Sequence, residues 1–140
     1  MVSVSFHVSI SHLKQERFDI VEIMVVSSEL VGDGTFEKVA KKCGHSLESI
    51  TTGADALRIS SKKQIDLILL DTSLPDMKGY ALIAEIKKIL PQSKVIVAAE
   101  PNFSELESTD KDEKIDYYLI KPLDEGYIEN IINHIAKQIG

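Results

Sequence analysis

Hydrophobic and polar positions follow two rhythms along this chain of 140 residues. In residues 2–11, apolar residues alternate strictly with serine or histidine, which is the period of a half-buried β-strand. From residue 21 onward, short apolar runs alternate with segments whose apolar residues recur at helical spacing. Several runs are apolar at consecutive positions, which is typical of parallel strands covered on both faces. The pattern predicts an α/β domain with a doubly wound sheet, preceded by one extra strand.

The apolar runs predict five strands, and the segments between them predict about five helices. Two of the helices have clear inward faces, formed by apolar residues at helical spacing. The strands are expected at residues 21–26, 46–52, 65–71, 94–99 and 115–120, and helices at 35–44, 54–63, 80–90 and 127–139. The inward residues are Leu82, Ile83, Ile86, Ile89 and Leu90 in one helix, and Ile128, Ile131, Ile132 and Ile135 in the other.

The remaining helix would fall at residues 100–114, between the fourth and fifth strands. This segment holds six acidic residues and two lysines, and only Phe103 and Leu106 could anchor it. Because packing of an apolar face supplies most of a helix's stability, we expect this segment to be short, irregular or mobile. The chain length fits one domain, at residues 20–140, with residues 1–19 as an N-terminal extension that contains the extra strand.

Composition and charge exclude several classes of function. The formal net charge is −6, which argues against a nucleic-acid surface, because phosphate binding needs clustered lysine and arginine. No apolar run approaches the length of a membrane span and no signal-peptide pattern opens the chain, so we expect a cytoplasmic protein. Cys43 is the only cysteine, which excludes an internal disulfide. The four histidines lack metal-ligand spacing, and no Ser-His-Asp arrangement indicates an enzyme.

The candidate functional residues lie at the carboxyl ends of the predicted strands, because ligands bind beyond those ends in a doubly wound sheet. We expect Asp71 and Lys121 to form an ion pair there, since burying either charge alone would be costly. The strand-end residues are Ser27 and Ser28 after the first strand, Asp71 at the end of the third, Ala98 and Ala99 at the end of the fourth, and Lys121 after the fifth.

These motifs resemble the response-regulator receiver domain, which has a flavodoxin-like fold. The resemblance covers roughly residues 20–139 and rests on "GADAL" at the entry of the second helix, "LLDTSLPDMKGY" around the third strand end, and "YLIKP" at the fifth. It implies a five-stranded parallel sheet of order 2-1-3-4-5. It also implies that Asp71 stands at the phosphoacceptor position and Lys121 at the family's lysine position. Ala98 and Tyr118 stand at the two switch positions.

The chain departs from the receiver pattern in two places. Receivers carry an acidic pair after the first strand, where this chain has Ser27 and Ser28, and a hydroxyl residue at the position of Ala98. The acidic pair helps to hold Mg²⁺, a hard ion that prefers carboxylate and phosphate oxygens. Two neutral serines therefore predict a degenerate acidic pocket without a metal ion. A methyl group at Ala98 cannot hydrogen-bond a phosphoryl group, so coupling to Tyr118 would lack its usual link.

These departures predict an atypical pseudo-receiver, a signalling protein-interaction module without normal Mg²⁺-dependent phosphorylation and without a cofactor. The alternative is a phosphoacceptor receiver that a histidine kinase phosphorylates on Asp71 in a two-component phosphorelay. Mg²⁺ would then be held by Asp71 and the backbone of Ser73, with Glu29 or Asp33 as a substitute ligand. Small-ligand binding at the switch point is a third class. The expected partner is a histidine kinase or an output protein, and a homodimer could form through the N-terminal strand.

Overall fold

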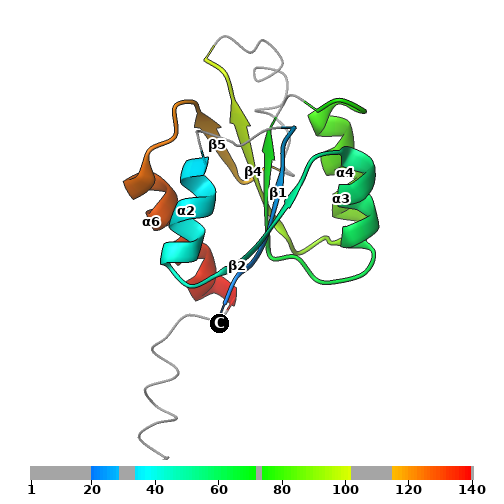
Figure 1. Cartoon of the computed structure of the whole chain (residues 1–140). Coiled ribbons are helices and arrows are strands. Elements are labelled where there is room, and N and C mark those ends of the chain that lie inside the picture. Colours follow the sequence, from blue (N-terminus) through cyan, green and yellow to red (C-terminus); the bar gives the residue numbers. More distant parts are fainter. Residues whose placement is uncertain (1–19, 29–33, 72–73, 102–114, 140) are drawn as a thin grey trace, which may run out of the picture.

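The structure is a computed structural model that describes residues 20–28, 34–71, 74–101 and 115–139. Every strand and helix predicted within these ranges is present, with shifts of a few residues at its ends (Figure 1). The strands are β1 (Glu22–Val26), β2 (Ser46–Ile50), β3 (Leu67–Asp71), β4 (Lys94–Ala99) and β5 (Tyr117–Ile120). The helices are α2 (Thr35–Lys42), α3 (Gly53–Ser60), α4 (Gly79–Ile89) and α6 (Glu125–Ile139).

The five strands form one parallel sheet in the order β2-β1-β3-β4-β5. Parallel neighbours need crossover connections, which place helices on the faces of the sheet. In Figure 1, α2 and α6 cover one face and α3 and α4 cover the other. The predicted fold class, a doubly wound five-stranded sheet of order 2-1-3-4-5, is therefore confirmed.

Consecutive residues of the central strands face opposite sides of the sheet, and both sides are apolar. In β1, Ile23 and Val25 pack in one cluster with residues of α2 and α6. Met24 and Val26 pack in a second cluster with residues of α3 and α4. All four side chains are at most 2% exposed. This burial on both faces explains the continuous apolar runs in the sequence, and it holds the strand ends in a fixed arrangement.

The buried faces of α4 and α6 follow the predicted helical periodicity with one exception. The periodicity places Ile89 inward, and this prediction is wrong, because its side chain is 39% exposed. At about 100° per residue, Ile89 lies at the margin of the buried arc, and it is also the last residue of α4, so one side of it stays in solvent. The residues confirmed as buried are Leu82, Ile83, Ile86, Leu90, Ile128, Ile131, Ile132 and Ile135.

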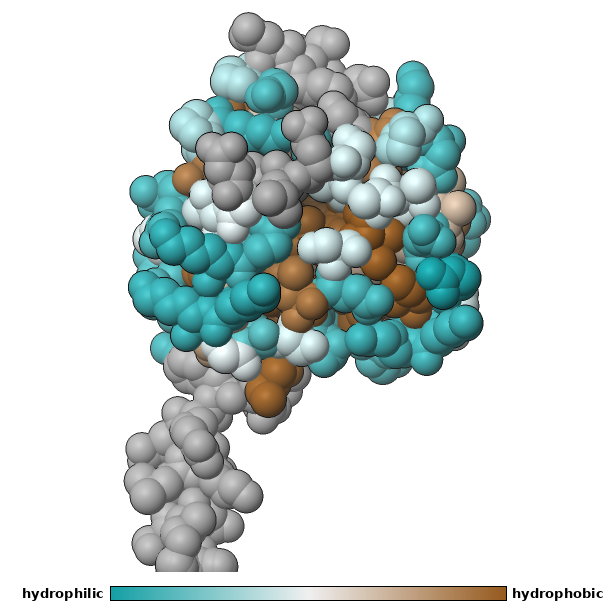
Figure 2. Space-filling model, viewed as in Figure 1, coloured by the Kyte–Doolittle hydropathy of each residue, from teal (hydrophilic) through white to brown (hydrophobic). Residues whose placement is uncertain are grey.

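Local signals set the start of the two helices that follow β1 and β2. Gly34 precedes α2 with a φ of 82°, a left-handed conformation that favours glycine. Thr52 caps α3, where its side chain accepts a hydrogen bond from the Asp55 N–H at 3.1 Å. Figure 2 shows hydrophilic residues over both helices and hydrophobic residues between them, along the β2 edge of the sheet. The partly buried Leu47 of β2 belongs to this edge.

Several predictions fall outside the described residues. They concern the extra strand at residues 2–11, nearly all of the segment between β4 and β5, and the metal-ligand candidates Glu29, Asp33 and Ser73. Among the helices that are described, none combines the length and the hydropathy required to cross a bilayer.

Candidate functional site

Three of the predicted site residues meet at the carboxyl end of the sheet. Ser27 directly follows β1, Asp71 is the last residue of β3, and Lys121 directly follows β5. β1 lies next to β3, whereas β4 separates β3 from β5, so the long Lys121 side chain reaches across the end of β4. Parallel strands bring such residues to the same edge, which is where doubly wound folds bind ligands.

One carboxylate oxygen of Asp71 accepts hydrogen bonds from both neighbours. Ser27 Oγ donates to Asp71 Oδ2 at 3.1 Å, and Lys121 Nζ donates to the same oxygen at 2.9 Å. The Asp71 side chain is 3% exposed and that of Lys121 is 21% exposed. A buried carboxylate requires hydrogen-bond donors and an opposite charge, and these two groups supply both. The predicted ion pair between Asp71 and Lys121 is therefore confirmed.

Backbone hydrogen bonds hold both donors in place. The Ser27 N–H donates to the Ile50 carbonyl at the end of β2, at 2.8 Å. The Lys121 N–H donates to the Ala99 carbonyl at the end of β4, at 2.9 Å, and the Lys121–Pro122 peptide bond is cis. The group around Asp71 is thus attached to the ends of all five strands rather than to one mobile loop.

The two predicted switch positions lie on opposite sides of the sheet. Ala98 is aligned with Asp71 in the β3–β4 register and is fully buried among residues of α2 and α6. Tyr118 is aligned with Val97, and its half-buried side chain packs against the cluster of α3 and α4. The Ala98 methyl group cannot donate or accept a hydrogen bond beside Asp71. Ser28, the other residue of the predicted pocket, is exposed to solvent.

The described residues of this site do not match the ligands that Mg²⁺ needs. Mg²⁺ prefers an octahedral set of oxygens from carboxylates, phosphates and water. The described site offers the single carboxylate of Asp71, whose Oδ2 already accepts from a hydroxyl and an ammonium group. Across the described ranges, no group of three or more His, Cys, Asp or Glu side chains is arranged to hold a metal ion. These residues by themselves therefore do not form a Mg²⁺ site.

Asp76 is a functional candidate that the sequence analysis missed. Its Oδ1 accepts the Gly53 N–H at 2.9 Å and its Oδ2 accepts the Ala54 N–H at 3.0 Å, so it caps the first two residues of α3. The N–H of Gly53 and then that of Ala54 hold the pKa of the Asp76 carboxyl below its usual value. No local sequence signal reveals this contact, because donor and acceptor are 22 to 23 positions apart.

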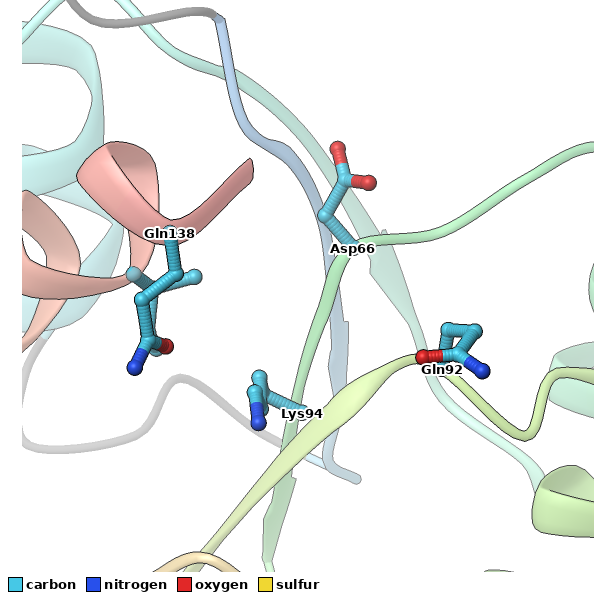
Figure 3. A pocket seen from close by; sticks show the side chains of 5 residues that line it. Asp66, Gln92, Lys94 and Gln138 are labelled. Atoms are coloured by element: carbon cyan, nitrogen blue, oxygen red, sulfur yellow. The ribbon is translucent and has the colours of Figure 1, made fainter. Parts of the chain in front are cut away.

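A cavity of about 540 Å³ lies at the other end of the sheet. Figure 3 shows four of its lining residues around the opening, Asp66 and Lys94 at the start of β3 and β4, Gln92 before β4, and Gln138 near the end of α6. Asp66 precedes the first residue of β3 and Asp71 is the last, so the whole strand separates the cavity from the Asp71 group. The cavity is therefore not part of the strand-end site.

Comparison with known proteins supports one family. The model of the response regulator receiver domain matches residues 23–133. The transcriptional regulatory protein GlrR of Escherichia coli (strain K12) is 26% identical over 95 residues, which cover 68% of this chain and 21% of that protein. The probable transcriptional regulator ycf27 of Cyanidium caldarium is 30% identical over 96 residues, 69% of this chain and 38% of that protein. The chain thus spans well under half the length of these two relatives.

Solved structures show the same fold. The receiver domain (CheY-like) from Methylobacillus flagellatus aligns with a TM-score of 0.71 and 27% identity, over 84% of this chain and 99% of that one. A CheY-like receiver domain protein from Methanospirillum hungatei JF-1 aligns with a TM-score of 0.75 and 22% identity, over 86% and 98% of the two chains. Together with the sheet order and the Asp71–Lys121 pair at the strand ends, these matches show that the chain belongs to the receiver domain family of two-component response regulators.

Proposed function

We propose that this receiver domain is a pseudo-receiver, a protein-interaction module that does not carry out Mg²⁺-dependent phosphorylation of Asp71. The hydrogen bond from Ser27 Oγ to Asp71 Oδ2, at 3.1 Å, is the main support. A hydroxyl donor stabilises the Asp71 carboxylate without a metal ion. A carboxylate at the Ser27 position would instead repel Asp71 unless a cation lay between them, which is the arrangement that a metal-dependent receiver needs.

The charge balance of the site supports the same proposal. Transfer of a phosphoryl group to a carboxylate brings two anions together, and cations must offset the charge on the moving group. The described site supplies one positive charge, from Lys121, and Asp71 already accepts a hydrogen bond from it at 2.9 Å. The approach of an anionic phosphodonor to Asp71 is therefore poorly compensated.

The second candidate function is that of a phosphoacceptor receiver modified on Asp71 by a histidine kinase. The observation that favours it is the position of Asp71 at the end of β3, in contact with Lys121. The sensor histidine kinase RcsC of Escherichia coli (strain K12) is 25% identical over 121 residues, which cover 86% of this chain and 13% of that protein. This similarity supports a place in two-component signalling for either candidate.

The two candidate functions predict different results in one simple measurement. We expect no phosphoryl mass adduct when the native chain is incubated with Mg²⁺ and a small-molecule phosphodonor, because the transferred group lacks sufficient cationic stabilisation. Intact-protein mass spectrometry tests this, and Asp71→Asn is the matched control, since it removes the acceptor oxygen but keeps the shape of the side chain. An adduct on the native chain that is missing from Asp71→Asn would favour the phosphoacceptor function.

The partner of the module is inferred to be a protein, either a histidine kinase or an output protein. Two large apolar side chains are exposed near each other in the sequence, Ile120 at the end of β5 (44%) and Tyr127 in the first turn of α6 (52%). Exposed apolar residues of this size are common at protein-binding surfaces. Tyr80 and Ile89 of α4 are exposed as well, at 42% and 39%, so exposure makes the β5–α6 side a candidate binding surface alongside α4.

A homodimer through residues 2–11 is part of the same proposal. This segment lies outside the described residues, but its strict alternation favours a strand, and a strand needs a partner for its backbone groups. We expect deletion of residues 1–12 to convert a dimer into a monomer, as measured by sedimentation or light scattering. An oligomeric state that the deletion leaves unchanged would contradict the dimer.

A further inference from the structure

The segment that follows the Asp71 site is fastened to α3 by two adjacent residues. The Asp76 carboxylate accepts the N–H groups of Gly53 and Ala54 at 2.9 and 3.0 Å. The Met77 side chain covers Gly53 so closely that a Cβ atom there would lie 2.6 Å from the Met77 sulfur. One residue thus supplies a polar contact and the next an apolar contact to the same helix start. We call the contact of Asp76 and Met77 with Gly53 and Ala54 the α3 clamp.

The α3 clamp satisfies backbone groups that α3 does not satisfy by itself. The first N–H groups of a helix have no partner within the helix. In α3, the Thr52 side chain accepts only the Asp55 N–H, at 3.1 Å, which leaves the N–H groups of Gly53 and Ala54 for Asp76. A carboxylate at this position also interacts favourably with the positive end of the helix dipole. The start of α3 therefore depends on where the segment carrying Asp76 lies.

The α3 clamp has an exposed half, at Ala54, and a buried half, at Gly53 beneath Met77. Asp76 and Ala54 are exposed to solvent, so water can replace the hydrogen bonds between them. Met77, by contrast, is partly buried against the cluster of α3 and α4. A displacement of Asp76 would therefore expose the Ala54 N–H to water and would uncover the buried Gly53 N–H, so the state of the α3 clamp can be read from these two amides.

At the described end of β4, Ala98 and Ala99 have only methyl side chains, which offer no contact comparable to the α3 clamp. Ala98, aligned with Asp71, is fully buried and has only a methyl group to present. Tyr118 packs on the other side of the sheet from Ala98. A change at Asp71 therefore has no hydrogen-bonding side chain at Ala98 through which to reach Tyr118, and its described link to β5 is the ion pair with Lys121. Asp76, by contrast, lies five positions after Asp71 and contacts α3 directly.

We propose that Asp76 is the positioning residue that couples the Asp71 site to α3, in place of coupling through the end of β4. This inference rests on the proposed function, because it concerns how the same site communicates with the surface of a pseudo-receiver. The start of α3 is then the part of the fold that responds when the contacts of Asp71 change.

The test measures the backbone amide signals of Gly53 and Ala54 by NMR in the full chain, in buffer containing a metal chelator. Asp71→Asn serves as the perturbation, because it weakens the contacts with Ser27 and Lys121 while keeping the shape of the side chain. We expect Asp71→Asn to shift both amide resonances and to speed their hydrogen exchange. In the Asp76→Asn background, the response to Asp71→Asn should be largely lost.

Asp55→Asn is the matched control for the Asp76→Asn background. It removes the same charge from the same end of α3, but the Asp55 carboxylate pairs with Arg58, at 3.4 Å, and not with the N–H groups of Gly53 or Ala54. The response of those amides to Asp71→Asn should persist in the Asp55→Asn background. Persistence in the Asp76→Asn background as well, or amides that never respond, would overturn the coupling.

The outcome is separate from the test of the proposed function. The amide measurements contain no metal ion and no phosphodonor, so they report on the coupling alone. A phosphoryl adduct on Asp71 would refute the pseudo-receiver and leave the amide result standing. Conversely, a response confined to Val97, Tyr118 and Leu119 would refute coupling through Asp76, whatever the mass measurement shows.

Discussion

Replacing Lys121 with methionine is expected to lower the free energy of unfolding by about 2 kcal/mol, which is less than the roughly 3–5 kcal/mol lost when a fully buried ion pair is broken. Methionine keeps most of the apolar stem but removes the ammonium group 2.9 Å from Asp71 Oδ2. The Asp71 carboxylate, only 3% exposed, would lose the positive charge that compensates its burial. The estimate is reduced because Lys121 itself is 21% exposed. Urea denaturation measures the change.

Lys38→Met is the matched control for this substitution. Lys38 Nζ lies at the same distance, 2.9 Å, from Glu125 Oε2, but these two side chains are 69% and 48% exposed. Breaking an exposed pair costs less than about 1 kcal/mol. The double variant, Asp71→Asn with Lys121→Met, should also lose less stability than the sum of the single changes. In the double variant, removal of the ammonium group no longer leaves a buried carboxylate uncompensated. Equal small losses for Lys121→Met and Lys38→Met would show that the strand-end pair adds no special stability.

The fold could be predicted because the apolar pattern of each strand shows whether one or both of its faces are buried. A run such as Ile23, Met24, Val25 and Val26 is apolar on both faces only when helices cover both sides of the sheet, and each face indeed packs in its own cluster. Helical spacing likewise predicted the buried face of α6. Periodicity failed at Ile89, because the average spacing does not show where a helix ends or how wide its buried arc is.

Only those residues of the site that stand at the ends of strands could be predicted from the sequence. Ser27, Asp71 and Lys121 end or follow parallel strands, so the order of the sheet alone brings them together. By its sequence position Ser27 is a missing metal ligand, whereas in the structure it donates a hydrogen bond to Asp71. Asp76 could not have been found, because its contact with α3 depends on the path of the segment between β3 and α4. Strand order does not determine that path.

Ser27→Asp combined with Ser28→Asp is expected to give the domain a dependence on Mg²⁺ and to tighten Mg²⁺ binding at least about tenfold, or about 1.4 kcal/mol. The hydroxyl that now donates to Asp71 at 3.1 Å would become a carboxylate. Two carboxylates at such a short separation repel each other in metal-free buffer. Mg²⁺ between them would remove the repulsion and gain oxygen ligands. At a concentration of 100 times its dissociation constant, the ion would then stabilise the variant by about 2.7 kcal/mol.

Thermal unfolding with chelator and with Mg²⁺ measures this effect, alongside a titration of the amide signals near Asp71. The charge-matched control is Ser49→Asp with Asn130→Asp, which adds two carboxylates at exposed positions of β2 and α6. The doubly acidic variant should be less stable than the native chain in chelator and should regain stability in Mg²⁺, whereas the native chain and the control should change little. Saturation of the native chain at low millimolar Mg²⁺ would contradict the pseudo-receiver, because Ser27 and Ser28 would then not have removed the metal site. A doubly acidic variant that ignores Mg²⁺ would show that carboxylates at these two positions are not sufficient to restore the site.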